Sequence, residues 1–245
     1  MTSSASIQLQ PALVLHTREF RNTSLLVDLI SPEHGRLRAV ARGARRNGSR
    51  HRPLLQLFHP VLVCLQGRGE LLTLTDVESA GSALMLRGER LFSGLYLNEL
   101  VVRMLPMHQP GSTLFARYHE TLRALADDQP VEPLLRYFEM DLLEESGYGL
   151  DLWHEADSGA PLEVGRQYLF HPEQGFERVP DTVPARNVYD GAVLVALRER
   201  TLTAQGGQLP MAKWLLRQAL APHLGQRPLK SREYFARLSP GRSGR

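Results

Sequence analysis

The hydrophobic pattern changes its period once along the chain, near residue 84, and this change limits the possible folds more than any other feature. Before it, short apolar runs separated by turn-forming residues predict five β-strands. We expect these strands at residues 12–17, 24–30, 36–42, 60–65 and 70–76. So small a sheet has no unpaired edge only when it closes on itself, which predicts a small barrel. Five strands with a basic face favour the OB-fold in particular.

Beyond residue 84 the apolar residues recur at the spacing of helices. Three helices are expected: one at 91–105, one that opens at 111–113 and runs through 125, and one from 133 to 146–147. The next segment, 148–187, is rich in Gly, Pro and Asp and indicates turns and short strands, one of them at 166–170. Two further helices are expected at 188–200 and 210–220.

These periods predict a multidomain α+β protein. An OB-fold domain is expected at 1–82 and a helical domain at 83–147. Residues 148–187 form an irregular insertion, and residues 188–245 supply C-terminal helices and a basic tail that pack with the helical domain.

Composition narrows the class of protein. Of 245 residues, 42% are hydrophobic and 22% are charged, which is typical of a soluble globular chain. No run approaches the roughly 18 apolar residues of a membrane helix, and residues 1–6 lack the basic and apolar regions of a signal peptide. The single cysteine, Cys64, excludes an internal disulfide. We therefore expect a cytoplasmic protein with no membrane partner.

Charge is divided unevenly along the chain. Residues 1–90 hold 12 Lys and Arg against 7 Asp and Glu, and residues 166–245 hold 13 against 6. Residues 91–165 hold only 4 against 13. Two basic segments thus flank an acidic one, which suggests different partners for different parts.

Seven arginines and no acidic residue lie between positions 36 and 52. Alternation within residues 36–42 places Arg36, Arg38, Val40 and Arg42 on one strand face and Leu37, Ala39 and Ala41 on the other. A run of one sign suits a polyanion, because neutralising phosphates releases counterions. We predict DNA contacts at the run and at two tail residues: Arg36, Arg38, Arg42, Arg45, Arg46, Arg50, Arg52, Lys230 and Arg232. The alternative is a merely exposed basic loop.

Catalytic motifs are missing from the sequence. It has no phosphate-binding loop of the G-x-x-x-x-G-K-[ST] type, no H-E-x-x-H and no paired cysteines for zinc. No cluster of metal-binding carboxylates accompanies the basic run. The sequence therefore favours a binding protein over an enzyme and predicts no cofactor and no metal.

Several short words of this sequence resemble the RecO family of bacterial recombination-repair proteins. They lie at residues 13–18, 33–38, 42–45, 66–70, 93–100, 147–149 and 228–233. The most specific are Tyr-Leu-Asn-Glu-Leu at 96–100 and Leu-Lys-Ser-Arg-Glu at 229–233. The resemblance covers almost the whole chain.

The resemblance implies an N-terminal OB-fold, a helical domain and, in many members, a zinc module. It also implies a nucleoid-associated DNA repair protein that binds single- and double-stranded DNA. Such a protein anneals complementary strands coated with single-stranded-DNA-binding protein (SSB). With the partner RecR it helps load the recombinase RecA, in the pathway of RecF.

One family pattern is absent from this chain. Other members place zinc-binding cysteines after the Gly-Tyr-Gly word, whereas this chain offers His154, Asp157 and His171 there. Those three side chains on a loose loop do not make a structural zinc site. We predict a remnant of the module without metal ligands.

We also expect this protein to dock on the acidic C-terminal tail of SSB, which requires a basic rim around a hydrophobic pocket. Cations are few in the acidic segment, and we predict the tail site at Arg136, with Leu135, Phe138 and Met140 beside it. The alternative is that Arg136 is an ordinary residue of the helix surface. A further alternative for the whole chain is a non-catalytic adaptor whose arginines contact an acidic protein.

Overall fold

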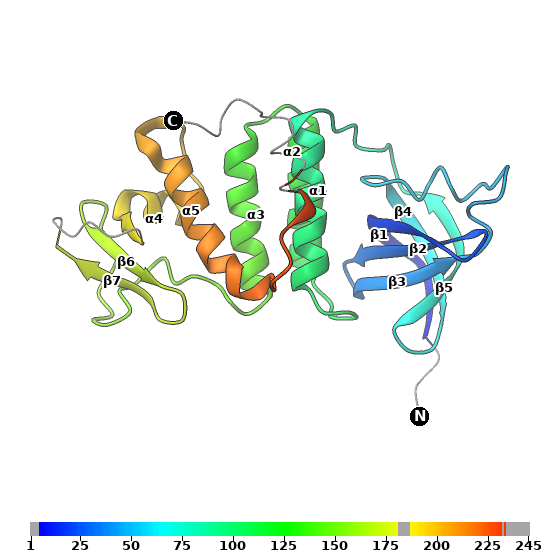
Figure 1. The fold of residues 1–245 in the computed structure, drawn as a ribbon, viewed down its shortest axis with the longest axis horizontal. Coiled ribbons are helices and arrows are strands. Elements are labelled where there is room, and N and C mark those ends of the chain that lie inside the picture. Colours follow the sequence, from blue (N-terminus) through cyan, green and yellow to red (C-terminus); the bar gives the residue numbers. More distant parts are fainter. Residues whose placement is uncertain (1–4, 181–186, 232, 234–245) are drawn as a thin grey trace. The chain divides into compact units, whose positions relative to one another are not determined.

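The computed structural model describes residues 5–180, 187–231 and 233. The chain forms two compact units. Figure 1 shows the helices and strands of both. The first contains residues 1–129 and 228–245, and the second contains residues 130–227. The domain limits expected after residues 82, 147 and 187 stay predictions beside this division.

A closed five-stranded barrel opens the first unit and confirms the predicted α+β fold with an OB-like N-terminal barrel. Its strands are β1 (Ala5–Phe20), β2 (Ser24–Ser31), β3 (Gly35–Ala41), β4 (Pro60–Gly67) and β5 (Leu71–Ser79). They follow the order β1-β2-β3-β5-β4, and the parallel pair β3–β5 closes the barrel. No edge of this sheet is left to pair with another chain.

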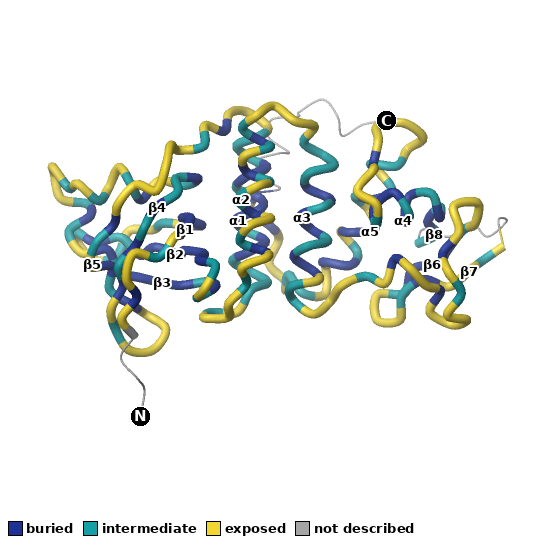
Figure 2. Tube along the Cα trace, turned by 180° about the vertical axis from the view of Figure 1, so that it is seen from behind, coloured by how far each residue is buried: buried dark blue, intermediate teal, exposed yellow. Residues whose placement is uncertain are grey.

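Strand β3 shows how the sequence builds the barrel core. Its burial alternates along the strand, and Leu37, Ala39 and Ala41 are fully buried inside the barrel, which Figure 2 shows coloured by burial. Side chains of a strand alternate between its two faces, so the residues between them point outward. The face assignment predicted for residues 36–42 is therefore confirmed.

Two helices follow the barrel in the first unit, α1 (Glu89–Met104) and α2 (Ser112–Ala126). A buried polar chain ties both to β1, because Asn98 donates to the Leu15 carbonyl at 2.9 Å. The Tyr118 hydroxyl in turn donates to the Asn98 side-chain oxygen at 2.5 Å. Buried amides need such partners, and these fix where α1 lies on the barrel.

The second unit combines helices with a small sheet of order β7-β6-β8. Its main elements are α3 (Val131–Glu145), β6 (Gln167–His171), β7 (Gly175–Val179), β8 (Val188–Asp190), α4 (Gly191–Arg198) and α5 (Gln208–Leu220). Two single 3-10 turns, Gln205–Gly207 and Ala221–His223, flank α5.

The helix expected at 188–200 was predicted wrongly at its start. Residues 188–190 form β8, in which Tyr189 pairs with Tyr168 of β6. The helix begins only at Gly191, whose backbone N–H donates to the Arg166 carbonyl at 2.8 Å. The short apolar run at the start of this segment suits a strand as well as a helix, and the pairing with β6 decided for the strand.

Candidate nucleic-acid interface

The outward face of β1, β2 and β3 carries the strand part of the arginine run. The register of the strands aligns the residues of this face in rows across β1, β2 and β3. The rows are Leu13–Ile30–Arg36, then His16–Asp28–Arg38, then Arg18–Leu26–Val40. Arg42 follows β3 at the next outward position. The arginines therefore follow one line along β3, but their surroundings differ from row to row.

Arg36 holds the end of a helix. Its guanidinium donates to the carbonyl oxygens of Val102 at 2.5 Å and Leu105 at 2.9 Å. The last carbonyls of a helix have no partners within it, and a cation is favoured there. Burial lowers the pKa of Arg36 despite the nearby carboxylate of Asp28. Arg36 thus fastens β3 to α1.

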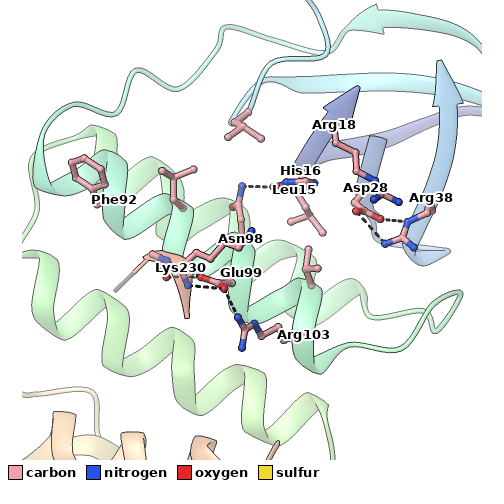
Figure 3. Close-up of a pocket in the computed structure, with 14 residues that line it drawn as sticks. Leu15, His16, Arg18, Asp28, Arg38, Phe92, Asn98, Glu99, Arg103 and Lys230 are labelled. Atoms are coloured by element: carbon pink, nitrogen blue, oxygen red, sulfur yellow. Dashed lines mark hydrogen bonds and ion pairs between the residues drawn. The ribbon is translucent and has the colours of Figure 1, made fainter. Parts of the chain in front are cut away.

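Arg38 is neutralised by a carboxylate. Its Nε and Nη2 donate to the two oxygens of Asp28 at 2.7 and 3.3 Å, as Figure 3 shows. The Asp28 side chain is only 8% exposed. The hydrogen bonds that Asp28 accepts raise the pKa of Arg38 and outweigh the opposite effect of burial. A forked pair of this kind is specific and well held.

Arg45 and Arg50 also have partners. The Arg45 guanidinium donates to the backbone carbonyls of Arg21 and Asn22, each at 3.3 Å, and lies 2.8 Å from Glu19. It therefore braces the turn between β1 and β2. Arg50 lies 3.4 Å from Asp76 with its side chain 82% exposed, and a surface pair of this kind contributes little.

Arg42, Arg46 and Arg52 differ from the other four arginines of the run. All three are exposed, Arg42 directly after β3 and the other two in the long loop that follows. Within residues 5–180, 187–231 and 233, no side-chain hydrogen bond or ion pair holds their guanidinium groups. These three charges are therefore available to a ligand without breaking any contact of the fold.

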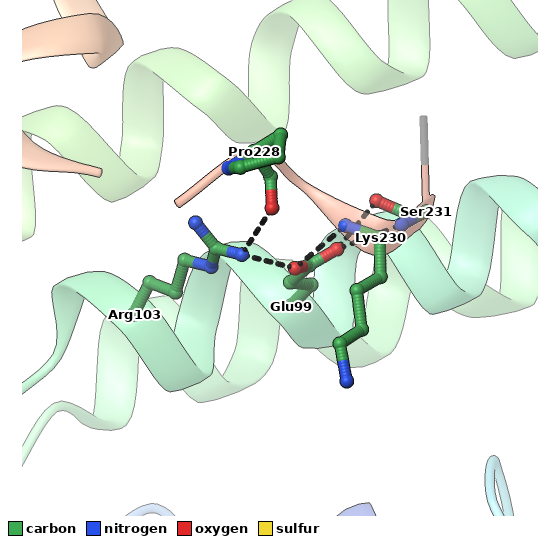
Figure 4. Close-up of polar contacts among 5 residues, drawn as sticks. All are labelled: Glu99, Arg103, Pro228, Lys230 and Ser231. Atoms are coloured by element: carbon green, nitrogen blue, oxygen red, sulfur yellow. Dashed lines mark hydrogen bonds and ion pairs between the residues drawn. The ribbon is translucent and has the colours of Figure 1, made fainter. Parts of the chain in front are cut away.

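The tail is fixed at a carboxylate of α1. Glu99 accepts hydrogen bonds from the backbone N–H groups of Lys230 and Ser231 and from the Ser231 hydroxyl, at 2.8 to 3.0 Å. Arg103 donates both to Glu99 and to the Pro228 carbonyl, each at 2.7 Å (Figure 4). Burial works against the Glu99 anion, yet these hydrogen bonds and Arg103 hold its pKa below its usual value.

Of the two tail residues predicted to contact DNA, the structure describes only Lys230. The Lys230 backbone is held at Glu99, and its side chain lines a pocket beside the barrel. Arg232 lies outside the described residues. The DNA contacts of both stay predictions.

The predicted SSB-tail residues lie on α3. Arg136 is buried, at 4% exposure, and its guanidinium donates to Glu139 at 2.6 Å. Leu135 and Phe138 are also buried, while Met140 is half-buried. A tail site at these residues stays a prediction.

The residues of the zinc-module remnant do not fit a zinc ion. His154 lies 3.4 Å from Asp151, and His171 lies 3.1 Å from Glu177. Among the described residues, no three His, Cys, Asp or Glu side chains gather as metal ligands, so His154, Asp157 and His171 do not form one donor set. The part of the chain that the structure describes also has no helix long and apolar enough to cross a membrane.

Sequence reasoning missed two features of this surface. One is the pairing of Glu99 with Ser231, although each residue belongs to one of the two most specific words. The other is Arg18, which lies one row from Arg38 on the same outward face. The alternation of β1 could have indicated Arg18, but nothing in the sequence indicates the contact across 132 residues.

Comparison with known proteins covers nearly the whole chain. The family model described as "Recombination protein O N terminal" matches residues 6–83, and "Recombination protein O C terminal" matches residues 85–233. The chain is 46% identical to "DNA repair protein RecO" of Cellvibrio japonicus over 96% of its own length and 99% of that protein. It is 48% identical to the protein of that name from Stutzerimonas stutzeri, with 94% of each chain covered. The Pseudomonas aeruginosa protein of that name is also 48% identical, over 92% of this chain and 94% of that protein.

Proposed function

This chain belongs to the RecO family of DNA repair proteins, whose role is that of a recombination mediator. We propose that it performs this role by binding DNA backbones and annealing complementary strands. It acts by binding alone, without a cofactor or a chemical step. The observation that carries the proposal is the group Arg42, Arg46 and Arg52, three exposed guanidinium groups within residues 42–52 that are free of internal partners among the described residues.

The chemistry of these arginines suits phosphates in either single or double strands. Guanidinium groups contact phosphate oxygens without reading bases, so the binding tolerates any sequence. Each neutralised phosphate releases counterions and makes the affinity depend steeply on salt. Two like-charged strands that are both neutralised can then meet and pair, and no nucleotide is consumed.

A triple variant tests the proposed surface. Arg42, Arg46 and Arg52 are replaced together by Ala, and a control replaces Arg87, Arg123 and Arg178, which are also exposed but lie outside the loop. For single strands the slope of log affinity against log salt should fall by about 0.7 for each lost phosphate contact, roughly 2 in total. The control should keep the parent slope, because its arginines lie outside the proposed surface. Equal slopes in the parent and the loop variant would show that DNA binds elsewhere.

The further activities implied by the family are part of the same proposal. We assign to this chain a partnership with RecR and with the acidic tail of SSB, and a role in loading RecA within the RecF pathway. The direct assay is annealing of two complementary oligonucleotides coated with SSB, without ATP or magnesium. Acceleration supports a mediator. Salt-insensitive DNA binding with no acceleration would favour an adaptor that contacts an acidic protein.

A further inference from the structure

A pocket of about 550 Å³ lies in the first unit, between the outward face of the barrel and α1. Residues 230–231 line it as well, and the Glu99 contacts described above hold them in place. This volume is within the range of pockets that bind small organic groups. The pocket belongs to the same outward face that leads to Arg42.

The lining of the pocket combines an apolar floor with a basic rim. Leu15, Leu57, Leu95 and Val102 contribute apolar surface. The two carboxylates of the lining are already engaged, Asp28 by Arg38 and Glu99 by Arg103 and Ser231. The side chains of Arg18 and Lys230 have no ion pair or hydrogen bond among the residues that the structure describes. The charge left over at the rim is therefore positive.

We propose that this pocket receives an unstacked nucleobase of single-stranded DNA, while Arg18 and Lys230 hold the phosphates beside that base. The inference rests on the proposed function and names its single-strand site. A base offers a flat apolar surface for the floor, and its neighbouring phosphates match the two free cations. Arg18 lies one row before the position of Arg42, so a strand held by the arginine loop continues directly to the pocket.

The proposal explains how one surface could treat single and double strands differently. Bases in a duplex are stacked and paired, and removing one costs a few kcal/mol. The arginine loop contacts phosphates in either form. Only a single strand presents bases that enter the pocket without this cost, so the pocket adds affinity for single strands alone.

A pocket-filling variant provides the test. Leu95→Trp fills the floor, and Met85→Trp places the same side chain at an exposed position outside the pocket as a control. Binding is measured by fluorescence anisotropy with three ligands: a single strand, a strand of equal length with abasic units instead of bases, and a duplex. The parent and Met85→Trp should bind the normal strand roughly tenfold more tightly than the abasic strand. Leu95→Trp should remove this preference, with its affinity for the normal strand falling to that for the abasic strand.

The outcomes separate this inference from the proposed function. If the parent protein binds normal and abasic strands equally, or if Leu95→Trp keeps the preference for the normal strand, the base-binding pocket is overturned. The proposal of backbone binding is then unaffected. A parent without any salt-sensitive DNA binding overturns the proposed function itself. An acidic peptide that competes for the pocket in the parent but not in Leu95→Trp, with DNA binding unaffected, assigns the pocket to a protein partner and also overturns the inference.

Lys230 provides a second readout that does not depend on altering the floor. The chain contains two lysines, and a Lys213→Arg variant retains only Lys230. A single strand with a natural abasic site presents an aldehyde, which forms an imine with a nearby lysine amine and releases water; borohydride then reduces the imine to a stable link. Crosslinking should fall at least fivefold when Lys230→Arg is added. Equal crosslinking of the two variants would remove Lys230 from the DNA path.

Discussion

The two ends of the arginine run use the same side chain for opposite purposes. At the end next to α1, Arg36 holds helix carbonyls and Arg38 is paired with Asp28. At the loop end, Arg42, Arg46 and Arg52 have no internal partner within the described residues. A count of basic residues treats these five as equal. Their contacts divide them into arginines that hold the fold and arginines that remain free for a polyanion.

Backbone hydrogen bonds also hold the end of the run next to α1. The Arg36 carbonyl accepts a hydrogen bond from the His108 N–H at 2.9 Å, and the Pro32 carbonyl accepts one from Gly111 at 3.3 Å. The turn between β2 and β3 is therefore fastened to the connection between α1 and α2. We expect substitutions here to change stability with little effect on DNA affinity, and substitutions at the loop end to do the reverse.

Gly35→Ala should have the largest effect on stability. Gly35 has φ +61°, and a Cβ there would lie 1.7 Å from the Gln109 carbonyl oxygen. Both the backbone strain and the overlap must be relieved, so the free energy of unfolding should fall by about 3–4 kcal/mol. Urea unfolding followed by circular dichroism measures this. Gly48→Ala is the control, because it shares the positive φ but has nothing within 4 Å of the added atom. A loss no greater than that of the control would mean that the two backbones are not in close contact.

Arg36→Ala should have the next largest effect. It removes two charge-assisted hydrogen bonds to the end of α1 and should lower the free energy of unfolding by about 2 kcal/mol. The salt slope of DNA binding should stay at the parent value. Arg42→Ala is its counterpart, with parent stability and a lower slope. If the slope also fell in Arg36→Ala, the division between holding and free arginines would not stand.

The sequence could predict which residues face outward but not which of them are occupied. Alternation fixed the face of Arg36, Arg38 and Arg42, because a strand has a period of two whatever surrounds it. The partners of Arg36 lie 66 and 69 residues further on, at the end of a helix whose place on the barrel depends on tertiary packing. Only the pairing of Arg38 with Asp28 could have been predicted, because the two residues lie opposite each other on adjacent strands.

The other tertiary features escaped prediction for the same reason. The sequence places Arg136 near Met140, a predicted residue of the same tail site. It does not show that Arg136 is buried and paired with Glu139. Residues 188–190 became a strand because β6 was there to pair with them. Barrel, helices and most of their limits follow from periodicity, whereas contacts between distant segments do not.

Glu99→Gln tests the second point at which α1 is fastened. Gln keeps one acceptor oxygen but loses the charge, so we expect a loss of about 1–2 kcal/mol at neutral pH. The pKa of Glu99 is lower in the folded protein than the ordinary value of 4.5. The carboxylate therefore contributes its full stability above pH 4.5 and loses it as the pH falls below that value toward the folded pKa. Unfolding curves of parent and variant should converge on acidification, and a constant gap would mean that the charge contributes nothing.

Asp28→Asn should convert a holding arginine into a free one. Without the carboxylate, Arg38 keeps its outward position in the row of His16 but loses its neutralising partner. One additional phosphate contact should raise single-strand affinity roughly fivefold at about 0.1 M salt and increase the salt slope by about 0.7. Glu78→Gln is the matched control, because it changes the net charge by the same amount at an exposed position on β5. A gain in Asp28→Asn but not in the control would show that pairing with Asp28, and not the position of Arg38, separates the two ends of the run. Equal affinities would show that DNA does not reach this row, and the free surface would then begin only at Arg42.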